Sequence, residues 1–228
     1  MRLFAIGDLH LPGGQEKPMD VFGGHWEGHF ERISQDWRNR VGADDVVLIP
    51  GDTSWAMQLK DAVPDLAAIG ELPGRKLLIR GNHDYWWGGI GQVRKALPEG
   101  MMAIQHDAVD LGDVVVTGTR GWAWPTEEAP LSPEDERVFN RELIRLEASL
   151  KAAGDREKYC FLHYPPIYQG YRCQEIIDLL ERYGVTRCCY GHLHGGSHRL
   201  AITGLQGTVD YSLVSADYLG FRPKLLLD

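Results

Sequence analysis

Side chains that can bind metal ions follow short apolar runs at several places along the sequence. They are Asp8 and His10 after the first run, Asp52 after the second, Asn82, His83 and Asp84 after the third, and His163, His192 and His194 after two later runs. Because the carboxyl ends of strands in an α/β sheet line one crevice, we expect these side chains to share one rim. Carboxylate, amide oxygen and imidazole together suit divalent ions such as Mn²⁺, Fe²⁺ or Zn²⁺.

Each piece of this pattern is weak alone, and the order of the pieces makes it specific. An Asp-x-His pair is common by chance, and a Gly-Asp pair is mostly a turn. Gly191-His192-x-His194 is firmer, because residues i and i+2 point the same way from a strand end. Even without His83 and Asp84, seven ligand candidates remain. Seven are too many for one ion, whereas two ions fit if one carboxylate bridges them. The glycines before the ligands allow sharp turns and leave space for a metal or phosphate.

The complete series resembles the five-motif signature of the calcineurin-like metallophosphoesterases, in particular the bacterial-type predicted phosphohydrolases. The motifs are Asp8-x-His10, Gly51-Asp52, Gly81-Asn82-His83-Asp84, His163 and Gly191-His192-x-His194. The resemblance implies a four-layer α-β-β-α sandwich with two mixed sheets and a dinuclear metal site between them. It also implies a ligand set in which Asp8, His10, Asp52 and His194 hold one ion, Asp52, Asn82, His163 and His192 hold the other, and Asp52 bridges.

The same resemblance implies a phosphoester hydrolysis in which a bridging hydroxide attacks phosphorus. His83 would contact the phosphate or protonate the leaving group, and Asp84 would orient the His83 ring. Asn82 would be a neutral oxygen ligand, which adds no negative charge where a phosphate binds. The second motif, Gly51–Met57, lacks the arginine with which protein phosphatases grip phosphate. A phosphodiesterase for small substrates is therefore favoured over a phosphomonoesterase or protein phosphatase.

Two alternatives to a phosphoesterase remain, namely a metal-free interaction scaffold and a dinuclear hydrolase for other substrates. The intact ligand set argues against the scaffold. For the substrate, Arg120 is a candidate phosphate contact. Trp87 and Trp122 either form a stacking wall for an aromatic group or belong to the core. The segments 11–28 and 120–130, the second of which includes Trp124, are long enough to wall the site.

The elements that must position these residues are predicted by periodicity. Strands buried on both faces are expected at Leu3–Ile6, Val46–Ile49, Leu77–Ile79, Val114–Val116, Cys160–Leu162 and Cys188–Tyr190, and helices at His25–Val41, Gln58–Leu72, Ser132–Ala153 and Gln174–Tyr183. The segments Ala103–Thr117 and Leu200–Val214 are typical of hairpins, so the sheets should be mixed. Alternating strands and helices without a linker predict one α/β domain over residues 1–228.

Composition limits the partners. With 24 Lys and Arg against 32 Asp and Glu, the net charge of −8 disfavours binding to polymeric nucleic acid. No apolar segment approaches the length of a signal peptide or a membrane helix, so we expect no membrane association. The four cysteines form no C-x-x-C pair, which argues against a thiolate zinc site and for a cytoplasmic protein. The sequence predicts neither the native substrate and metal nor the oligomeric state.

Overall fold

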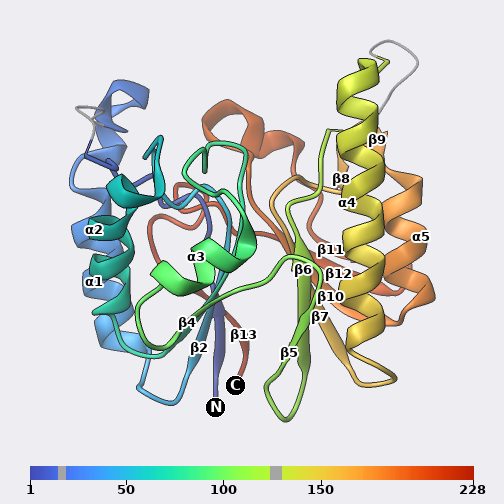
Figure 1. Cartoon of the computed structure of the whole chain (residues 1–228), viewed down its shortest axis with the longest axis horizontal. Coiled ribbons are helices and arrows are strands. Elements are labelled where there is room, and N and C mark those ends of the chain that lie inside the picture. The colour runs from blue at the N-terminus through green and yellow to red at the C-terminus, as the bar shows by residue number, and fades with distance from the viewer. Residues whose placement is uncertain (15–18, 124–129) are drawn as a thin grey trace.

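Two β-sheets pack face to face, and helices cover both outer faces (Figure 1). The computed structural model describes residues 1–14, 19–123 and 130–228. The helices α1 (His29–Arg40), α2 (Leu59–Gly70) and α3 (Ile90–Ala96) lie on one side, and α4 (Pro133–Ala152) and α5 (Gln174–Arg182) lie on the other. Short 3-10 helices, η1 (Met19–Phe22), η2 (Gly24–Trp26) and η3 (Gly195–Leu200), lie in the connections. This mixed α/β arrangement confirms the predicted fold class.

The first sheet has the strand order β13-β1-β2-β3-β4. Its strands are β1 (Leu3–Ala5), β2 (Val46–Pro50), β3 (Arg75–Ile79), β4 (Met101–Ala103) and β13 (Lys224–Leu227). The first four run parallel, and β13 pairs antiparallel with β1. The parallel strands therefore end at one edge of the sheet, where the predicted ligands begin.

The second sheet has the order β11-β12-β10-β7-β6-β5. Its strands are β5 (Ala108–Asp110), β6 (Val115–Thr119), β7 (Lys158–Leu162), β10 (Val185–Tyr190), β11 (Gly204–Gln206) and β12 (Val209–Leu213). The central four are parallel, and the edge strands β5 and β11 are antiparallel to their neighbours. A two-stranded ribbon, β8 (Ile167–Tyr168) and β9 (Tyr171–Arg172), completes the described strands.

Three hydrophobic clusters separate the four layers, and the alternation of side chains along each strand explains them. In β2, Val47 belongs to the cluster beneath α1 and α2, whereas Leu48 belongs to the cluster between the sheets. In β7, Phe161 faces the first sheet and Leu162 lies in the cluster beneath α4 and α5. Because both faces of the central strands are covered, their sequences read as continuous apolar runs.

Some predicted element bounds are wrong. Ala103–Thr117 is not one hairpin: β4 ends at Ala103 in the first sheet, and the chain crosses to the second sheet, where β5 and β6 form the expected hairpin around Gly112. The first helix begins at His29 rather than at His25, because Gly28 adopts the left-handed conformation with φ 56°. In the second predicted hairpin, β11 starts at Gly204, since η3 occupies residues 195–200. Within residues 1–14, 19–123 and 130–228, no helix has both the length and the apolar character needed to cross a bilayer.

Candidate metal centre

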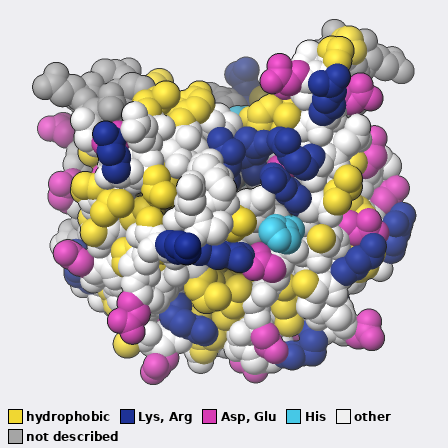
Figure 2. Space-filling model, viewed as in Figure 1, with side chains coloured by type: hydrophobic (Ala, Val, Ile, Leu, Met, Phe, Trp, Pro, Cys, Tyr) yellow, Lys and Arg dark blue, Asp and Glu magenta, His cyan; other side chains and the backbone are white. Residues whose placement is uncertain are grey.

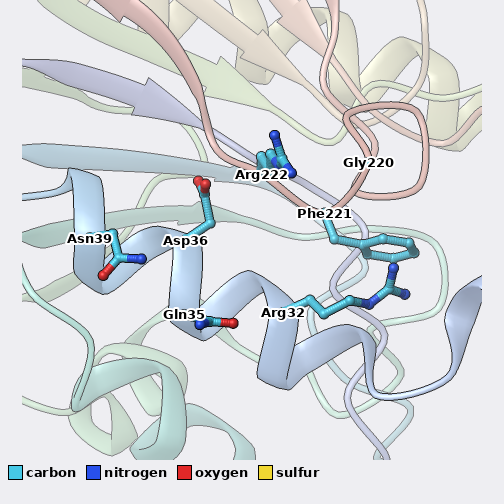
Figure 3. Close-up of a pocket in the computed structure, with 7 residues that line it drawn as sticks. All are labelled: Arg32, Gln35, Asp36, Asn39, Gly220, Phe221 and Arg222. Carbon is cyan, nitrogen blue, oxygen red and sulfur yellow. The ribbon is translucent and has the colours of Figure 1, made fainter.

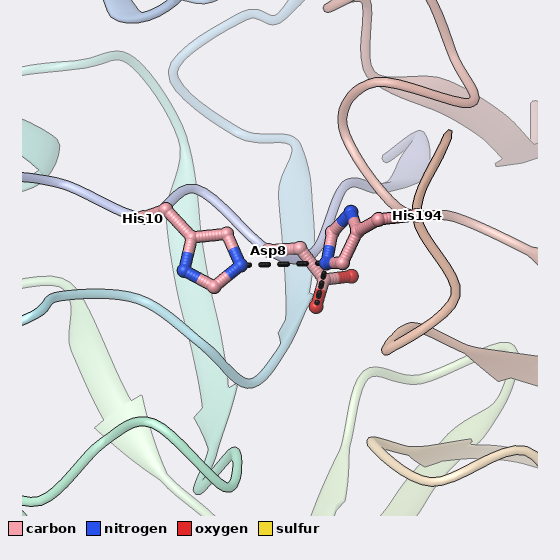
Figure 4. A group of neighbouring side chains, drawn as sticks. All are labelled: Asp8, His10 and His194. Atoms are coloured by element: carbon pink, nitrogen blue, oxygen red, sulfur yellow. Dashed lines mark hydrogen bonds and ion pairs between the residues drawn. The ribbon is translucent and has the colours of Figure 1, made fainter. Parts of the chain in front are cut away.

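The loops that follow β1 and β10 bring Asp8, His10 and His194 together (Figure 4). The rings of His10 and His194 point toward one another, with 3.3 Å between their Nε2 atoms. His194 Nε2 also lies 3.4 Å from Asp8 Oδ1. Asp8 is fully buried, His10 is 4% exposed and His194 is 30% exposed, so a carboxylate and two imidazoles face one small, mostly buried volume. We call this group the His10 half of the centre.

The loops after β3, β7 and β10 form a second group. Asn82 Oδ1 lies 2.5 Å from His163 Nε2 and 2.9 Å from His192 Nδ1. We call these three residues the His163 half of the centre. Asp52, from the loop after β2, lies between the halves: its Oδ2 is 3.7 Å from His10 Nε2 and 3.6 Å from His163 Nε2. The structure therefore brings all seven sequence-predicted ligand candidates to one place.

The backbone around these ligands is strained. Five non-glycine residues in the described part of the chain have a left-handed φ, and four of them are ligand candidates: Asp8, His10, Asp52 and His192. Such conformations cost energy and persist where the surroundings enforce them, which is common at functional sites. Glycine is required beside them, since a Cβ on Gly81 would lie 2.1 Å from Asp52 N and one on Gly191 would lie 2.4 Å from Asp8 Oδ2.

Hydrogen bonds from the second ring nitrogen orient the imidazoles of His163 and His194. His163 Nδ1 lies 3.0 Å from the carbonyl oxygen of Pro50, and His194 Nδ1 lies 2.9 Å from Asp217 Oδ1. In both cases an Nδ1–H donor leaves the Nε2 lone pair free to face the centre. Asp217 was missed by the sequence analysis. The pattern used to find the ligand candidates also applies to Asp217, because Asp217 follows the apolar run of β12 within a few residues.

The electrostatics of the site are those of crowded carboxylates and of imidazoles that burial keeps neutral, apart from His194. Burial raises the pKa of Asp52 well above its ordinary value, and the nearby Asp8 and Asp84 carboxylates raise it further. Burial lowers the pKa values of His10 and His192 to about 3. For His194, burial opposes protonation, but Asp8 and Asp217 raise its pKa to about 10. Buried carboxylates that repel each other and neutral imidazoles are the donor set that divalent ions bind.

His83 and Asp84 lie beside this centre. The His83 ring is 4.6 Å from the Trp55 ring and 5.8 Å from the His10 ring, and its backbone N–H donates to Asp52 Oδ1 at 2.8 Å. Asp84 is buried and accepts from Gly81 N at 2.7 Å and Thr53 N at 2.9 Å. Asp84 thus joins the loops that carry Asp52 and Asn82, and its role in orienting the His83 ring stays a prediction.

The stacking residues expected from the sequence lie elsewhere. Trp87 is only 2% exposed and packs in the cluster beneath α1 and α2, so it presents no face to a substrate at the metal centre. Its predicted substrate contact stays a prediction, since Trp87 also lines a smaller pocket with Arg80 and Arg120. Trp122 packs against the cluster beneath α4 and donates from Nε1 to Asp135, and the guanidinium of Arg120 lies over its ring. Parts of both predicted wall segments, residues 15–18 and 124–129 with Trp124, lie outside the described residues.

A pocket of about 260 Å³ opens beside the His10 half. His10, His83 and His194 form its floor, and its walls are Met19, Phe22, Trp26 and Trp55. The Trp55 ring stacks on His10 with 4.8 Å between centroids. A larger pocket of about 380 Å³, between α1 and residues 220–222, is lined by no ligand candidate (Figure 3). The aromatic-walled pocket is lined by both His10 and His194, so it can hold a substrate at the centre.

Comparison with known proteins agrees with this geometry. The family model of calcineurin-like phosphoesterases matches residues 1–196. Among solved structures, phosphopantetheinyl hydrolase (PptH) from Mycobacterium tuberculosis superposes with a TM-score of 0.62 at 15% identity, covering 99% of this chain and 95% of that one. A protein of unknown function from Aquifex aeolicus, AQ665, has a TM-score of 0.57 at 15% identity, with 98% and 95% covered. At such identity these structures show the fold alone.

A curated relative is more similar over a shorter stretch. The gene 66 protein of Mycobacterium phage L5 is 38% identical over 79 residues, which are 34% of this chain and 37% of that protein. The match thus spans just over a third of that relative. The family match covers most of the chain and includes the motifs whose side chains the fold brings together. The chain therefore belongs to the calcineurin-like phosphoesterase family.

Proposed function

We propose that the chain is a metal-dependent phosphodiesterase that hydrolyses small phosphoesters at a centre for two divalent ions. The observation that carries this proposal is the position of Asp52, whose Oδ2 is nearly equidistant from His10 Nε2 and His163 Nε2. A single carboxylate between two imidazole groups is the arrangement that two ions sharing one ligand require. Asp8, His10, Asp52 and His194 would hold one ion, and Asp52, Asn82, His163 and His192 the other.

The residues present fit divalent ions of the Mn²⁺, Fe²⁺ or Zn²⁺ type, because the donors are mixed oxygen and nitrogen and are mostly buried. When bound, such ions supply Lewis acidity to phosphoryl oxygens and a strong nucleophile from water at neutral pH. Asn82 contributes an oxygen without a charge, which favours an anionic substrate. Pro50 and Asp217 fix the rings of His163 and His194, so the donors are arranged before a substrate arrives.

His83 is the proton donor in this proposal. It lines the pocket with His10 and His194, and unlike them it belongs to neither proposed ligand group. Its backbone N–H is bonded to Asp52 Oδ1, which fixes the ring close to where a phosphoryl group would sit. A side chain in that place can stabilise charge on a phosphoryl oxygen and protonate the leaving oxygen.

The pocket walls support an ester with an aromatic or other apolar group. Trp26, Trp55 and Met19 give the pocket an apolar side next to the histidines. The second motif lacks the arginine that would favour a dianionic monoester, so a diester is the preferred substrate. Small phosphoesters are expected rather than polymeric nucleic acid, given the net charge of −8. We expect the enzyme to act in the cytoplasm.

The proposal is tested by a substrate panel on chelator-treated protein reloaded with Mn²⁺, Fe²⁺, Zn²⁺ or Mg²⁺. An aryl phosphodiester should be hydrolysed only after a transition metal is added, and at least as readily as the corresponding monoester. Activity that survives complete metal removal would contradict the metal-dependent mechanism. A strong preference for the monoester would leave the family assignment intact and favour the alternative, a phosphomonoesterase or protein phosphatase. Purified protein that binds no metal at all would favour an interaction scaffold.

A further inference from the structure

A separate pocket, on the His163 side of the centre, is lined by arginines. It has a volume of about 120 Å³, and Arg80, Arg120 and Arg145 line it together with Gly88 and Gly89. We call this pocket the arginine pocket. On the face of the molecule that Figure 2 shows, Lys and Arg side chains gather between α3 and α4. No ligand candidate lines the arginine pocket, so it is distinct from the metal centre.

Charge in the arginine pocket is unbalanced. Among the described residues that line it, Glu142 is the one acid, and its side chain is 3% exposed. Arg145 forms an ion pair with Glu142 at 2.6 Å, and Thr119 Oγ1 donates to the same carboxylate at 2.6 Å. Arg120 lies farther away, at 3.8 Å. One carboxylate therefore faces three guanidinium groups, and the pocket carries an excess of positive charge.

Two of these arginines have buried donors without acceptors. The Arg120 side chain is 10% exposed, and its Nε has no hydrogen-bond partner in the described residues. The Nε of Arg80 is buried and also lacks one. Leaving a charged donor buried and unsatisfied is costly, so an acceptor is expected. The ion pair with Glu142 accounts for the presence of Arg145 in the pocket. No such pairing accounts for Arg80, for which the described part of the chain offers no ion pair.

We propose that the arginine pocket binds a second phosphate group of the substrate, apart from the phosphate at the metal centre. This inference rests on the proposed function. Arg80 is two residues from Asn82, so their Cα atoms lie at most about 7 Å apart. The carbonyl oxygen of Arg120 accepts from His163 N at 3.1 Å. The loops that carry the metal ligands thus also carry the pocket, and one substrate can reach both.

The size and the donors of the pocket define the ligand. About 120 Å³ is room for one tetrahedral oxyanion, and the three guanidinium groups that line the pocket favour an anion over an apolar group. Guanidinium groups bind phosphate oxygens through paired charge-assisted hydrogen bonds. The enzyme would then prefer phosphoesters that carry an additional phosphate, with the apolar group in the aromatic-walled pocket.

Equilibrium binding tests the pocket without any turnover. Full-length chelator-treated protein is titrated with inorganic phosphate by calorimetry at low salt. We expect one phosphate to bind, about tenfold or more weakly in Arg80→Gln, with partial recovery in Arg80→Lys. Arg94→Gln is the matched control, because Arg94 lies on α3 and is already paired with Asp107, and it should bind as wild type does. Equal binding by wild type and Arg80→Gln, or no binding by wild type, would overturn the proposal.

Kinetics on loaded enzyme test whether substrates use the pocket. The two probes are an aryl diester of a nucleoside 5′-phosphate and the same ester carrying a 3′-phosphate. In wild type the added phosphate should lower KM about tenfold, and in Arg80→Gln the ratio of the two KM values should approach one. An unchanged ratio in Arg80→Gln overturns the assignment. If loaded wild type hydrolyses neither ester, the proposed function fails, while the phosphate titration still decides the pocket.

Discussion

The two halves of the metal centre are held in place in different ways. In the His163 half, the orienting partner is the carbonyl oxygen of Pro50, and the ring of His163 is fully buried. In the His10 half, the partner of His194 is the Asp217 carboxylate, and the His194 side chain is 30% exposed. The first half is thus fixed by backbone within the sheets, whereas the second depends on a side chain from the segment after β12.

This difference indicates which half can be tuned. The acceptor that orients His163 is a backbone carbonyl, which a substitution at Pro50 does not remove. The hydrogen bond that orients His163 is therefore expected to survive such a substitution. The His10 half borders the aromatic-walled pocket and depends on charges that a single substitution removes. We expect the metal in the His10 half to be the more easily lost and the more dependent on pH.

The largest effect is expected where the halves meet. Asp52→Asn should abolish turnover and lose both metals, because one carboxylate serves both halves. Asp8→Asn is the matched control: Asp8 lies 3.4 Å from His194 Nε2 and 3.9 Å from His163 Nδ1, but that His163 nitrogen bonds to Pro50, so metal should be lost mainly in the His10 half. Metal content after dialysis, measured per chain, separates the two variants. If Asp52→Asn and Asp8→Asn lose metal equally, Asp52 is not the shared ligand.

His83→Ala should leave metal binding in both halves unchanged and still slow the reaction strongly. His83 lines the pocket but is not part of the proposed ligand set, so metal content should stay at the wild-type level. Loss of a general acid usually costs about 10²–10⁴-fold in rate, and we expect kcat to fall in that range. A leaving group of low pKa needs less protonation, so an activated aryl ester should lose less than an alkyl ester. Loss of metal as severe as in Asp52→Asn would show that His83 is a ligand.

The clustering of the ligand candidates could be predicted from the sequence because each follows an apolar run, and the ends of parallel strands meet at one edge. That argument needs no knowledge of how the two sheets pack. The same argument would have found Asp217 had it been applied to the run that forms β12, although Asp217 contacts a ligand rather than the metal site itself. The strand pairing of Ala103 could not be predicted, because the crossing from one sheet to the other follows from tertiary packing and not from local periodicity.

The tryptophans could not be assigned for a different reason. After Asp84 the chain turns, with Trp87 N bonded to the carbonyl oxygen of Asp84, and the indole Nε1 of Trp86 donates to the Asp84 carboxylate. These bonds direct both rings beneath α1 and α2 and away from the aromatic-walled pocket. Trp55 and Trp26, far apart in sequence, form the wall instead. Adjacency to a motif therefore did not indicate which way a side chain points.

Asp217→Asn sharpens the contrast between the halves. Substitution of a residue that orients a metal ligand typically lowers metal affinity 10–100-fold, and we expect that loss in the His10 half only. The His163 half should keep its ion, because its orienting partner is Pro50. Competition with a graded series of chelators would show one weakened site and one unchanged site. Equal weakening of both sites would mean that the halves are not independent.

The pH dependence of the metal-free chain tests the same charges. The pKa of His194 is raised to about 10 from its ordinary 6.5, so its stabilising effect is complete below pH 6.5 and is lost as pH rises through 10. Over that range the unfolding free energy of wild type should fall by about 4 kcal/mol relative to His194→Gln, since each unit of pKa shift corresponds to about 1.4 kcal/mol. Urea unfolding of both proteins from pH 6 to pH 10 measures the difference. Parallel curves would contradict the raised pKa.

The smallest effect concerns the pocket wall. Trp55 stacks on His10 and lines the pocket, so Trp55→Ala should raise KM for an aryl diester about fivefold, at the low end of the ~1–3 kcal/mol that a stacked ring contributes. KM for an alkyl diester should change less. Trp87→Ala is the control, since that ring is 2% exposed and borders the arginine pocket rather than the aromatic-walled one: it should lose about 3–5 kcal/mol of stability and leave KM unchanged in the folded fraction for an aryl diester without a second phosphate. A rise in aryl KM in Trp87→Ala but not in Trp55→Ala would return the stacking role to Trp87. Because the Trp55 ring stacks on His10 and lies against His83, a change in KM without a change in metal content would also show that substrate binding and metal binding are separable on that side of the centre.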